Sequence, residues 1–336
     1  MERRTKVELF LLDNLIWLIL AGYFLINALV TPRFFTYNNI INIFYHSTIL
    51  GMLVLGQGLV LMTGHLDLSI ESTLAFAPGI AILLTTKWVL GLNPIIAIIL
   101  TLLIGALVGL FNGYCITRIG INAFLQTLSM LIILRGLVLY LIPLAIYGLD
   151  EAYIFFGRAR TFGNIPVAVF LMLGIFVLFD FVLKRTPFGR YLLATGGNAR
   201  ASYISGINTN KSIISAFVLA GLLASVAGLL AAGRQNAVNN TMGDGMVLLS
   251  FAGAILGGVS VSGGKGTSIG MLGGTLFLGM ISNSLTLLGV NVFIVYALQG
   301  LLIFVALVLD RVKVKAEELL FRREMLKKLG ISMKQD

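Results

Sequence analysis

Residues 94–116 read PIIAIILTLLIGALVGLFNGYCI, an apolar run without a charged side chain. A helix of roughly 20 apolar residues is long enough to cross the hydrocarbon core of a bilayer. The rest of the chain has the same character: 58% of its 336 residues are hydrophobic, 11% are charged, and the mean hydropathy is +0.99. We therefore expect an all-α integral membrane protein that is surrounded by the lipid bilayer.

Similar apolar runs recur along the chain, and we expect about ten transmembrane helices. The eighth run is short and glycine-rich, and the second and third nearly abut, so nine and eleven spans remain alternatives. The first run is long and lacks a small-residue cleavage pattern, which indicates a retained anchor and not a signal peptide. The expected spans are 9–30, 40–63, 70–89, 94–116, 122–146, 165–183, 212–233, 246–262, 267–288 and 292–310.

The distribution of basic residues favours an even number of spans with the N- and C-termini both cytoplasmic. In that arrangement 18 of the 24 Lys and Arg side chains are cytoplasmic, five are external, and Arg135 alone lies within a span. The positive-inside rule predicts this asymmetry. It also explains the net charge of +10, so no nucleic-acid partner is implied. We expect one transmembrane domain, 1–310, and a basic cytoplasmic tail, 311–336, which is either solvated or lies on the inner leaflet.

The chain contains few of the residues and motifs that an enzyme mechanism requires. Its one cysteine, Cys115, excludes an internal disulfide and a cysteine metal cluster. Its two histidines, His46 and His65, are far apart in sequence and lack a neighbouring second ligand. The glycine-rich run 257–268 lacks the Gly and the Ser or Thr that a phosphate-binding loop needs around its lysine, so we expect a tight turn there. We expect no enzyme activity, no cofactor and no metal.

The longest polar stretch between two apolar spans is 184–211, KRTPFGRYLLATGGNARASYISGINTNK, which contains five basic and no acidic residues. Thr186-Pro187 is predicted to end the preceding helix, because proline disfavours helical geometry in the residue before it. Asn198 is a suitable N-cap for a short helix. Gly206 is a natural stop, because glycine tolerates the left-handed conformation. The pattern predicts a capped helix on the cytoplasmic face that a soluble partner holds; an ordinary basic loop is the alternative.

Polar side chains within the expected spans are candidates for a solute pathway. Arg135 lies near the middle of its span and should face protein, water or a partner carboxylate, because an intramembrane charge is costly. Its alternative role is a structural ion pair. Three amides can exchange hydrogen bonds with a hydroxylated solute, although each can equally join two helices. They are Asn112, Gln126 and Asn283.

Two further patterns concern surfaces. The external segment 147–164 mixes aromatic residues with Asp150, Glu151 and Arg158, which suits a docking surface for a partner; a loop folded onto neighbouring helices is the alternative. Glycines recur every four positions in 94–116, at Gly105, Gly109 and Gly113. They lie on one face of the expected helix, so that another helix can approach closely. We expect internal packing there in preference to a subunit interface.

Four blocks of this sequence resemble the permease subunits of bacterial ABC importers for monosaccharides, the ribose-type family that includes autoinducer-2 permeases. Together they extend over most of the chain and occur in the family's order. The blocks are GHLDLSIES (64–72), GLFNGYCITRIGINAFLQTLSMLIILRG (109–136), TPFGRYLLATGGNARASYISGIN (186–208) and GAILGGVSVSGGKGTSIGMLGGTL (253–276).

The resemblance implies a permease in the bacterial plasma (inner) membrane. It implies three partners: a cytoplasmic ABC ATPase, an extracytoplasmic sugar-binding protein, and a second permease copy or a paralogue. The block 186–208 is similar to the loop that contacts the ATPase. By position, the residues that the resemblance assigns to this contact are Phe188, Gly189, Arg190, Gly196, Asn198, Ala201 and Gly206.

Glu71 departs from the family pattern, which commonly has glycine there, and its purpose does not follow from the sequence. The solute is not identified either: a ribose-like pentose or a hexose is expected, with autoinducer-2 or a branched-chain amino acid as alternatives. An ion-coupled secondary transporter that works alone is the rival from another class. It predicts uptake by the isolated chain in an ion gradient, whereas the importer predicts none.

Overall fold

The computed structural model describes residues 15–85 and 93–291, together with 293–295, 297–301, 304, 305, 308, 312 and 315. Part of the predicted tenth span, 292–310, lies outside these residues, and so do the start of the first span and nearly all of the tail at 311–336. The described part is helical apart from short strands and turns, which confirms an all-α membrane architecture.

Within the described residues, six helices are long and apolar enough to cross a membrane. They are α3 (Tyr37–Met62), α5 (Pro94–Tyr114), α6 (Ala123–Leu141), α8 (Val167–Arg185), α11 (Thr209–Gln235) and α13 (Ser268–Leu287). Three apolar helices are shorter: α2 (Leu15–Val30), α4 (Ile70–Leu83) and α12 (Met246–Leu256). A π-helical turn, η2 (Cys115–Ile119), continues α5.

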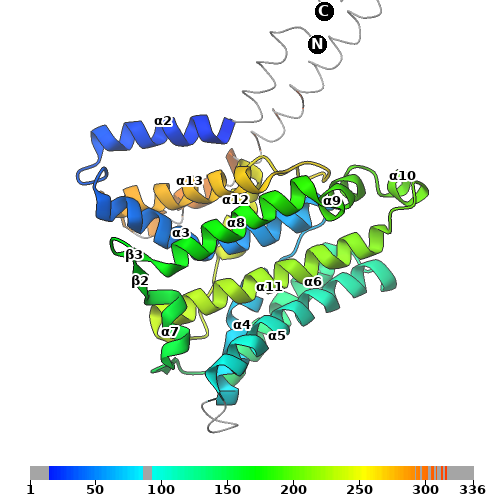
Figure 1. Cartoon of the computed structure of the whole chain (residues 1–336), viewed down its shortest axis with the longest axis horizontal. Coiled ribbons are helices and arrows are strands. Elements are labelled where there is room, and N and C mark those ends of the chain that lie inside the picture. Colours follow the sequence, from blue (N-terminus) through cyan, green and yellow to red (C-terminus); the bar gives the residue numbers. More distant parts are fainter. Residues whose placement is uncertain are drawn as a thin grey trace, which may run out of the picture.

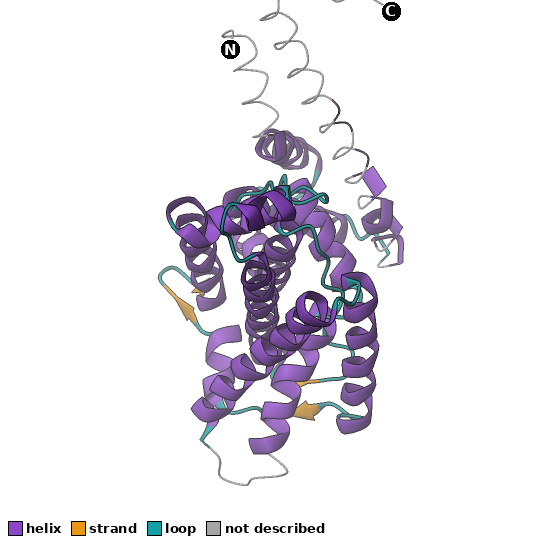
Figure 2. Cartoon of the chain, turned by 90° about the vertical axis from the view of Figure 1, so that its right-hand side faces the viewer, coloured by secondary structure: helices purple, strands orange, loops and turns teal. Residues whose placement is uncertain are grey.

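The long helices run side by side in one bundle (Figure 1). Helices α3 and α11 are mostly buried and form its centre, where α11 contacts α3, α4 and α5. Helices α5, α6 and α8 bury a smaller share of their surface and lie at the edge. Figure 2 looks at the bundle from the end that carries α9 (Pro187–Gly197) and α10 (Ala199–Ile204), and shows several helices nearly end-on.

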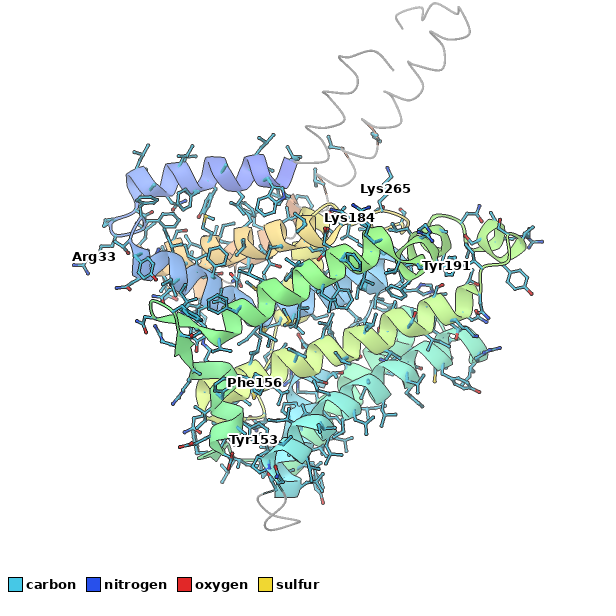
Figure 3. The ribbon with its side chains drawn as sticks, in the orientation of Figure 1. Arg33, Tyr153, Phe156, Lys184, Tyr191 and Lys265 are labelled. Carbon is cyan, nitrogen blue, oxygen red and sulfur yellow. The ribbon has the colours of Figure 1, made fainter. Side chains whose placement is uncertain are left out.

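Short elements cover the opposite end. They comprise the helix α7 (Glu151–Arg158) and two antiparallel strand pairs. One pair joins β1 (Ile146–Tyr147) to β4 (Ala237–Val238), and the other joins β2 (Arg160–Thr161) to β3 (Ile165–Pro166). Figure 3 shows Arg33, Tyr153 and Phe156 toward this end and Lys184, Tyr191 and Lys265 toward the other. The first end is the external one in the predicted topology.

Two predicted spans are longer than the helices that form. The span 122–146 ends at Leu141, since Pro143 follows within two residues and the chain turns into β1. The span 246–262 ends at Leu256, because Gly257 and Gly258 follow and Gly258 takes a positive φ of 84°. These predictions of continuous helices were wrong at their ends. The α-helix in 70–89 ends at Leu83, a π-helical turn continues it over 84–85, and the end of the predicted span, 86–89, lies outside the described residues.

The glycine stripe in α5 is internal packing, as predicted. A Cβ atom added at Gly105 would meet Ser225 and the carbonyl of Gly221, and one added at Gly109 would meet the backbone of Phe217. Both neighbours belong to α11, so the stripe lets the backbones of α5 and α11 lie against each other.

Candidate functional site

The coupling segment, residues 184–211, forms two short helices where the sequence predicted one. Helix α8 ends at Arg185, and α9 begins at Pro187, so the predicted break at Thr186-Pro187 is confirmed. Asn198 caps α10: its Oδ1 accepts a hydrogen bond of 2.9 Å from the backbone N–H of Ala201. The predicted N-cap is therefore confirmed.

The end of α10 also follows the prediction. Gly206 has a φ of 86°, and its N–H donates to the carbonyl of Tyr203. The N–H of Ile207 donates to the carbonyl of Ser202, which completes a Schellman motif. These bonds give α10 a defined length and direction although most of its surface is exposed: Tyr203 is 71% and Ile204 is 78% exposed.

The seven residues that the resemblance assigned to partner contact fall into two groups. Four are exposed on the surface of α9, α10 and the turn after them: Arg190, Asn198, Ala201 and Gly206. The other three face the bundle more closely: Phe188, Gly189 and Gly196. Phe188 packs against the apolar core, and a Cβ atom at Gly189 would meet the backbone of Leu183. The second group therefore fixes α9 to the bundle.

The C-terminal end of α9 packs against the end of α3 and against the glycine turn at 263–264. A Cβ atom at Gly196 would meet the carbonyl of Met62, at the end of α3, and the backbone nitrogen of Gly264. The Gly264 N–H donates to that same Met62 carbonyl at 3.0 Å. Gly263 and Gly264 both have positive φ, so the run 257–268 forms the predicted tight turn. A displacement of α9 would thus press on α3 and on the turn that leads into α13.

A second site lies where two half-length helices meet. The Glu71 side chain, in the first turn of α4, accepts a hydrogen bond of 3.0 Å from the N–H of Val247, in the first turn of α12. The N-termini of α4 and α12 therefore face each other across a carboxylate, which suits their partial positive charge. The Ser72 hydroxyl donates to the carbonyl of Leu131, near the middle of α6, so the meeting point lies at mid-membrane depth.

Arg135 completes this half-helix junction. Its guanidinium lies 2.6 Å from Asp244 Oδ1 and 3.8 Å from Glu71 Oε1. It also donates to the carbonyls of Asn240 (2.8 Å) and Met242 (3.2 Å). The expected partner carboxylate is present, and the bonds correspond to the structural ion pair that was the alternative role. The sequence gives no purpose for Glu71, whereas the structure pairs it with Arg135 and with the N-terminus of α12.

Asn112 and Gln126 belong to a chain of hydrogen bonds beneath the junction. Gln126 donates to Asn112 at 3.2 Å, Asn112 donates to Ser69 Oγ at 2.9 Å, and Ser69 Oγ donates to Asp67 at 2.6 Å. Asp67 also accepts from the Ser69 N–H at 2.9 Å. The chain connects α5 and α6 to the start of α4.

Asn283 is not part of this chain. Its amide exchanges two hydrogen bonds, of 2.9 and 3.0 Å, with the amide of Asn39 in α3. Asn39 also donates to the carbonyl of Phe34. The four predicted pathway residues are therefore brought into three different networks, and only Asn112 and Gln126 contact each other.

At the end that carries α7, Asp150, Glu151 and Arg158 are exposed on α7 and the residue before it. Asp150 caps α7 by accepting from the N–H of Ala152, and Arg158 Nε donates to the carbonyl of Arg234 at the end of α11. The segment is thus folded onto its neighbours while its charged groups stay accessible. Burial raises the pKa of Tyr153, on the inner side of α7, to about 12, so its hydroxyl stays protonated.

One cluster at the same end of the bundle had no signal in the sequence. The Arg234 guanidinium lies over the ring of Tyr45, 4.3 Å from its centre, and contacts His46. The Tyr45 hydroxyl donates to the carbonyl of Gly157 at 2.6 Å. Because Arg234 and Tyr45 are distant in sequence, only the packing of α11 on α3 brings them together. His46 has the structural setting expected for a lone histidine.

Comparison with known proteins gives consistent results. Residues 39–307 match the family described as "Branched-chain amino acid transport system / permease component". The chain is 33% identical to the ribose import permease protein RbsC of Escherichia coli K12, over 93% of this chain and 97% of that protein. It is 36% identical to RbsC of Bacillus subtilis 168, over 86% and 89%. The L-arabinose transport system permease protein AraH of E. coli K12 is 33% identical, over 89% and 90%.

No solved structure matches the chain. The family match covers well over half of its length, and several relatives above 30% identity align with nearly all of it. The expected resemblance to importer permeases is thereby confirmed. This chain is a multi-pass membrane protein that belongs to the family of branched-chain amino acid transport system permease components.

Proposed function

We propose that the chain is the membrane-spanning permease subunit of an ATP-driven importer for a monosaccharide, such as a ribose-like pentose or a hexose. A separate cytoplasmic ABC ATPase hydrolyses ATP, and an extracytoplasmic binding protein delivers the sugar. The relatives named for ribose and L-arabinose support this solute class. The chain carries out no covalent chemistry in this scheme.

The coupling segment is the observation that carries the proposal. Its five basic residues are all exposed, and it contains no acidic residue. Arg190 lies on α9 and Arg200 on α10, and the other three lie at the adjoining ends of α8 and α11. The N-cap at Asn198 and the Schellman motif at Gly206 stabilise the second helix although little of it is buried. Such a rigid, basic surface suits contact with an ATPase whose conformational change displaces α9 and α10. The contact between Gly196 and the end of α3 would transmit this displacement into the bundle.

The remaining assignments complete the scheme. The chain crosses the bacterial inner membrane about ten times with both termini inside, and it pairs with a second copy or a paralogue. Asp150, Glu151 and Arg158 receive the binding protein at the external end. The half-length helices α4 and α12 border the pathway and are held in position by Asn112, Gln126 and Arg135. Asn283 joins α13 to α3 through its hydrogen bonds with Asn39. These assignments are supported by the positive-inside rule and by the exposure of the α7 charges.

A reconstitution experiment tests the proposal. The tagged chain is purified from its native membrane with the ATPase and binding protein that accompany it, and the assembly is placed in proteoliposomes. We expect ATP-dependent uptake of labelled D-ribose or L-arabinose. ATP-dependent uptake of L-leucine in place of either sugar would support the amino acid alternative that the family description names. Uptake by the isolated chain in an ion gradient would contradict an importer.

A further inference from the structure

The segment between α11 and α12 enters the membrane without forming a helix. Residues 240–245 are turns, and Gly243 and Gly245 have positive φ. The segment reaches the level of Glu71, whose backbone would meet a Cβ atom added at Gly243. Since the neighbouring Ser72 is bonded to the middle of α6, residues 243–245 lie near mid-membrane. Backbone of this kind is stable at that depth only where it is buried in protein or lines water.

This segment is not fully buried. Thr241, Asp244, Gly245 and Leu248 are exposed, and the Asp244 side chain retains 56% of its accessible surface. A carboxylate that faced hydrocarbon at this depth would be strongly unfavourable. Two of its exposed neighbours, Thr241 and Gly245, offer hydroxyl or backbone groups for hydrogen bonds, beside the apolar side chain of Leu248. The exposed side of the segment therefore needs water next to it.

The charges at the junction are arranged asymmetrically. Glu71 has 11% of its side chain exposed and is bonded to the Val247 N–H, so it is directed inward and satisfies the N-terminus of α12. Arg135, with 16% exposed, lies between the two carboxylates. Asp244 is the accessible member of the three. A solute that passes this face therefore meets a negative group, while the arginine and the helix N-terminus are already occupied.

We propose that the face formed by Thr241, Asp244, Gly245 and Leu248 is a wall of the aqueous route through the membrane. Asp244 makes this route favour neutral and cationic solutes over anionic ones. Its free carboxylate lone pairs accept hydrogen bonds from the hydroxyls of a neutral polyhydroxylated solute, whereas an acidic sugar derivative is repelled. The inference deepens the proposed import of a monosaccharide and rests on it for the identity of the solute.

Thiol labelling tests the wall independently of transport. Cys115 is the only cysteine and is buried, so Cys115→Ser gives a cysteine-free background. Leu248→Cys is then exposed to two membrane-impermeant methanethiosulfonates, one with a quaternary ammonium and one with a sulfonate. We expect both to react. Ile99→Cys, at a residue 58% exposed in an apolar part of α5, is the control and should not react.

The ratio of the two labelling rates tests the role of Asp244. A unit charge about 7 Å away at an effective dielectric constant of about 20 attracts one reagent and repels the other, and after screening by salt it changes the ratio about 30-fold. Asp244→Asn should therefore reduce the preference for the cationic reagent about 30-fold, whereas Asp244→Glu should preserve it. With Asp244 intact, raising the salt concentration should weaken the same preference, which tests the charge even if the Asn variant does not fold.

Two results would overturn the inference. If the cysteines of both Leu248→Cys and Thr241→Cys stay unlabelled in membrane-inserted protein, this face does not line water. If they react but the rate ratio is the same with Asp244 and in Asp244→Asn, or ignores salt, Asp244 does not select by charge. The labelling requires neither ATPase nor sugar, so a failure of ATP-driven uptake would overturn the proposed function and leave this measurement standing.

Discussion

Replacing Arg135 by methionine tests the half-helix junction most severely. Methionine fills much of the same space but removes the positive charge and the two bonds to the carbonyls of Asn240 and Met242. Glu71 is then left as a buried carboxylate without its cation. Breaking a buried ion pair by removing one partner destabilises proteins by about 3–5 kcal/mol. The half-exposed Asp244 adds at most about 1 kcal/mol, because water screens it.

We therefore expect Arg135→Met to lower the free energy of unfolding by about 3–6 kcal/mol. The measurement is an SDS titration in detergent micelles, followed by circular dichroism. Adding Glu71→Gln should recover about half of the loss, since the Gln carbonyl can still accept from Val247 without a charge. Arg160→Met, at an exposed arginine with one bond to the Asn164 carbonyl, is the matched control and should stay within about 0.5 kcal/mol.

The reasoning would be refuted by an Arg135→Met protein within about 1 kcal/mol of the native chain. It would also be refuted if the double variant were less stable than Arg135→Met, because the uncompensated Glu71 charge would then not be the cause.

Three further variants test other parts of the structure. Gly109→Ala should destabilise by about 1–3 kcal/mol through a clash with the backbone of Phe217, whereas Gly174→Ala, with open space around it, should gain up to about 1 kcal/mol in the same SDS titration. Asn198→Ala should weaken α10 by about 0.5–2 kcal/mol, measured as faster amide exchange of residues 199–204; unchanged exchange would exclude the cap. Gln57→Leu should be neutral or stabilising by about 1–2 kcal/mol, because the buried amide has no hydrogen-bond partner among the described residues; a loss of stability would reveal one.

The features that the sequence predicts well are local. The helix break at Thr186-Pro187, the cap at Asn198 and the stop at Gly206 each depend on a few neighbouring residues. The glycine stripe that begins at Gly105 depends only on helical periodicity. The sequence predicts that this face packs closely against another helix, and the structure shows that the helix is α11. Such patterns need no knowledge of the rest of the chain.

The half-helix junction could not be predicted in this way. Glu71 and Val247 are far apart in sequence, and nothing near either residue indicates that the other will be its partner. The reciprocal pairing of Asn283 with Asn39 has the same origin. Polar groups within spans are recognisable because they are rare in apolar runs, but their partners are set by how the helices pack.

The central claim is that energy reaches this permease from a separate ATPase through α9 and α10. The most direct test compares solute uptake with ATP hydrolysis in proteoliposomes that contain the purified assembly, with the native chain or with Arg190→Ala and Asn198→Ala combined. We predict that the double variant loses uptake while the ATPase subunit still hydrolyses ATP. Uptake that remains as tightly coupled to ATP hydrolysis as in the native assembly would contradict the claim.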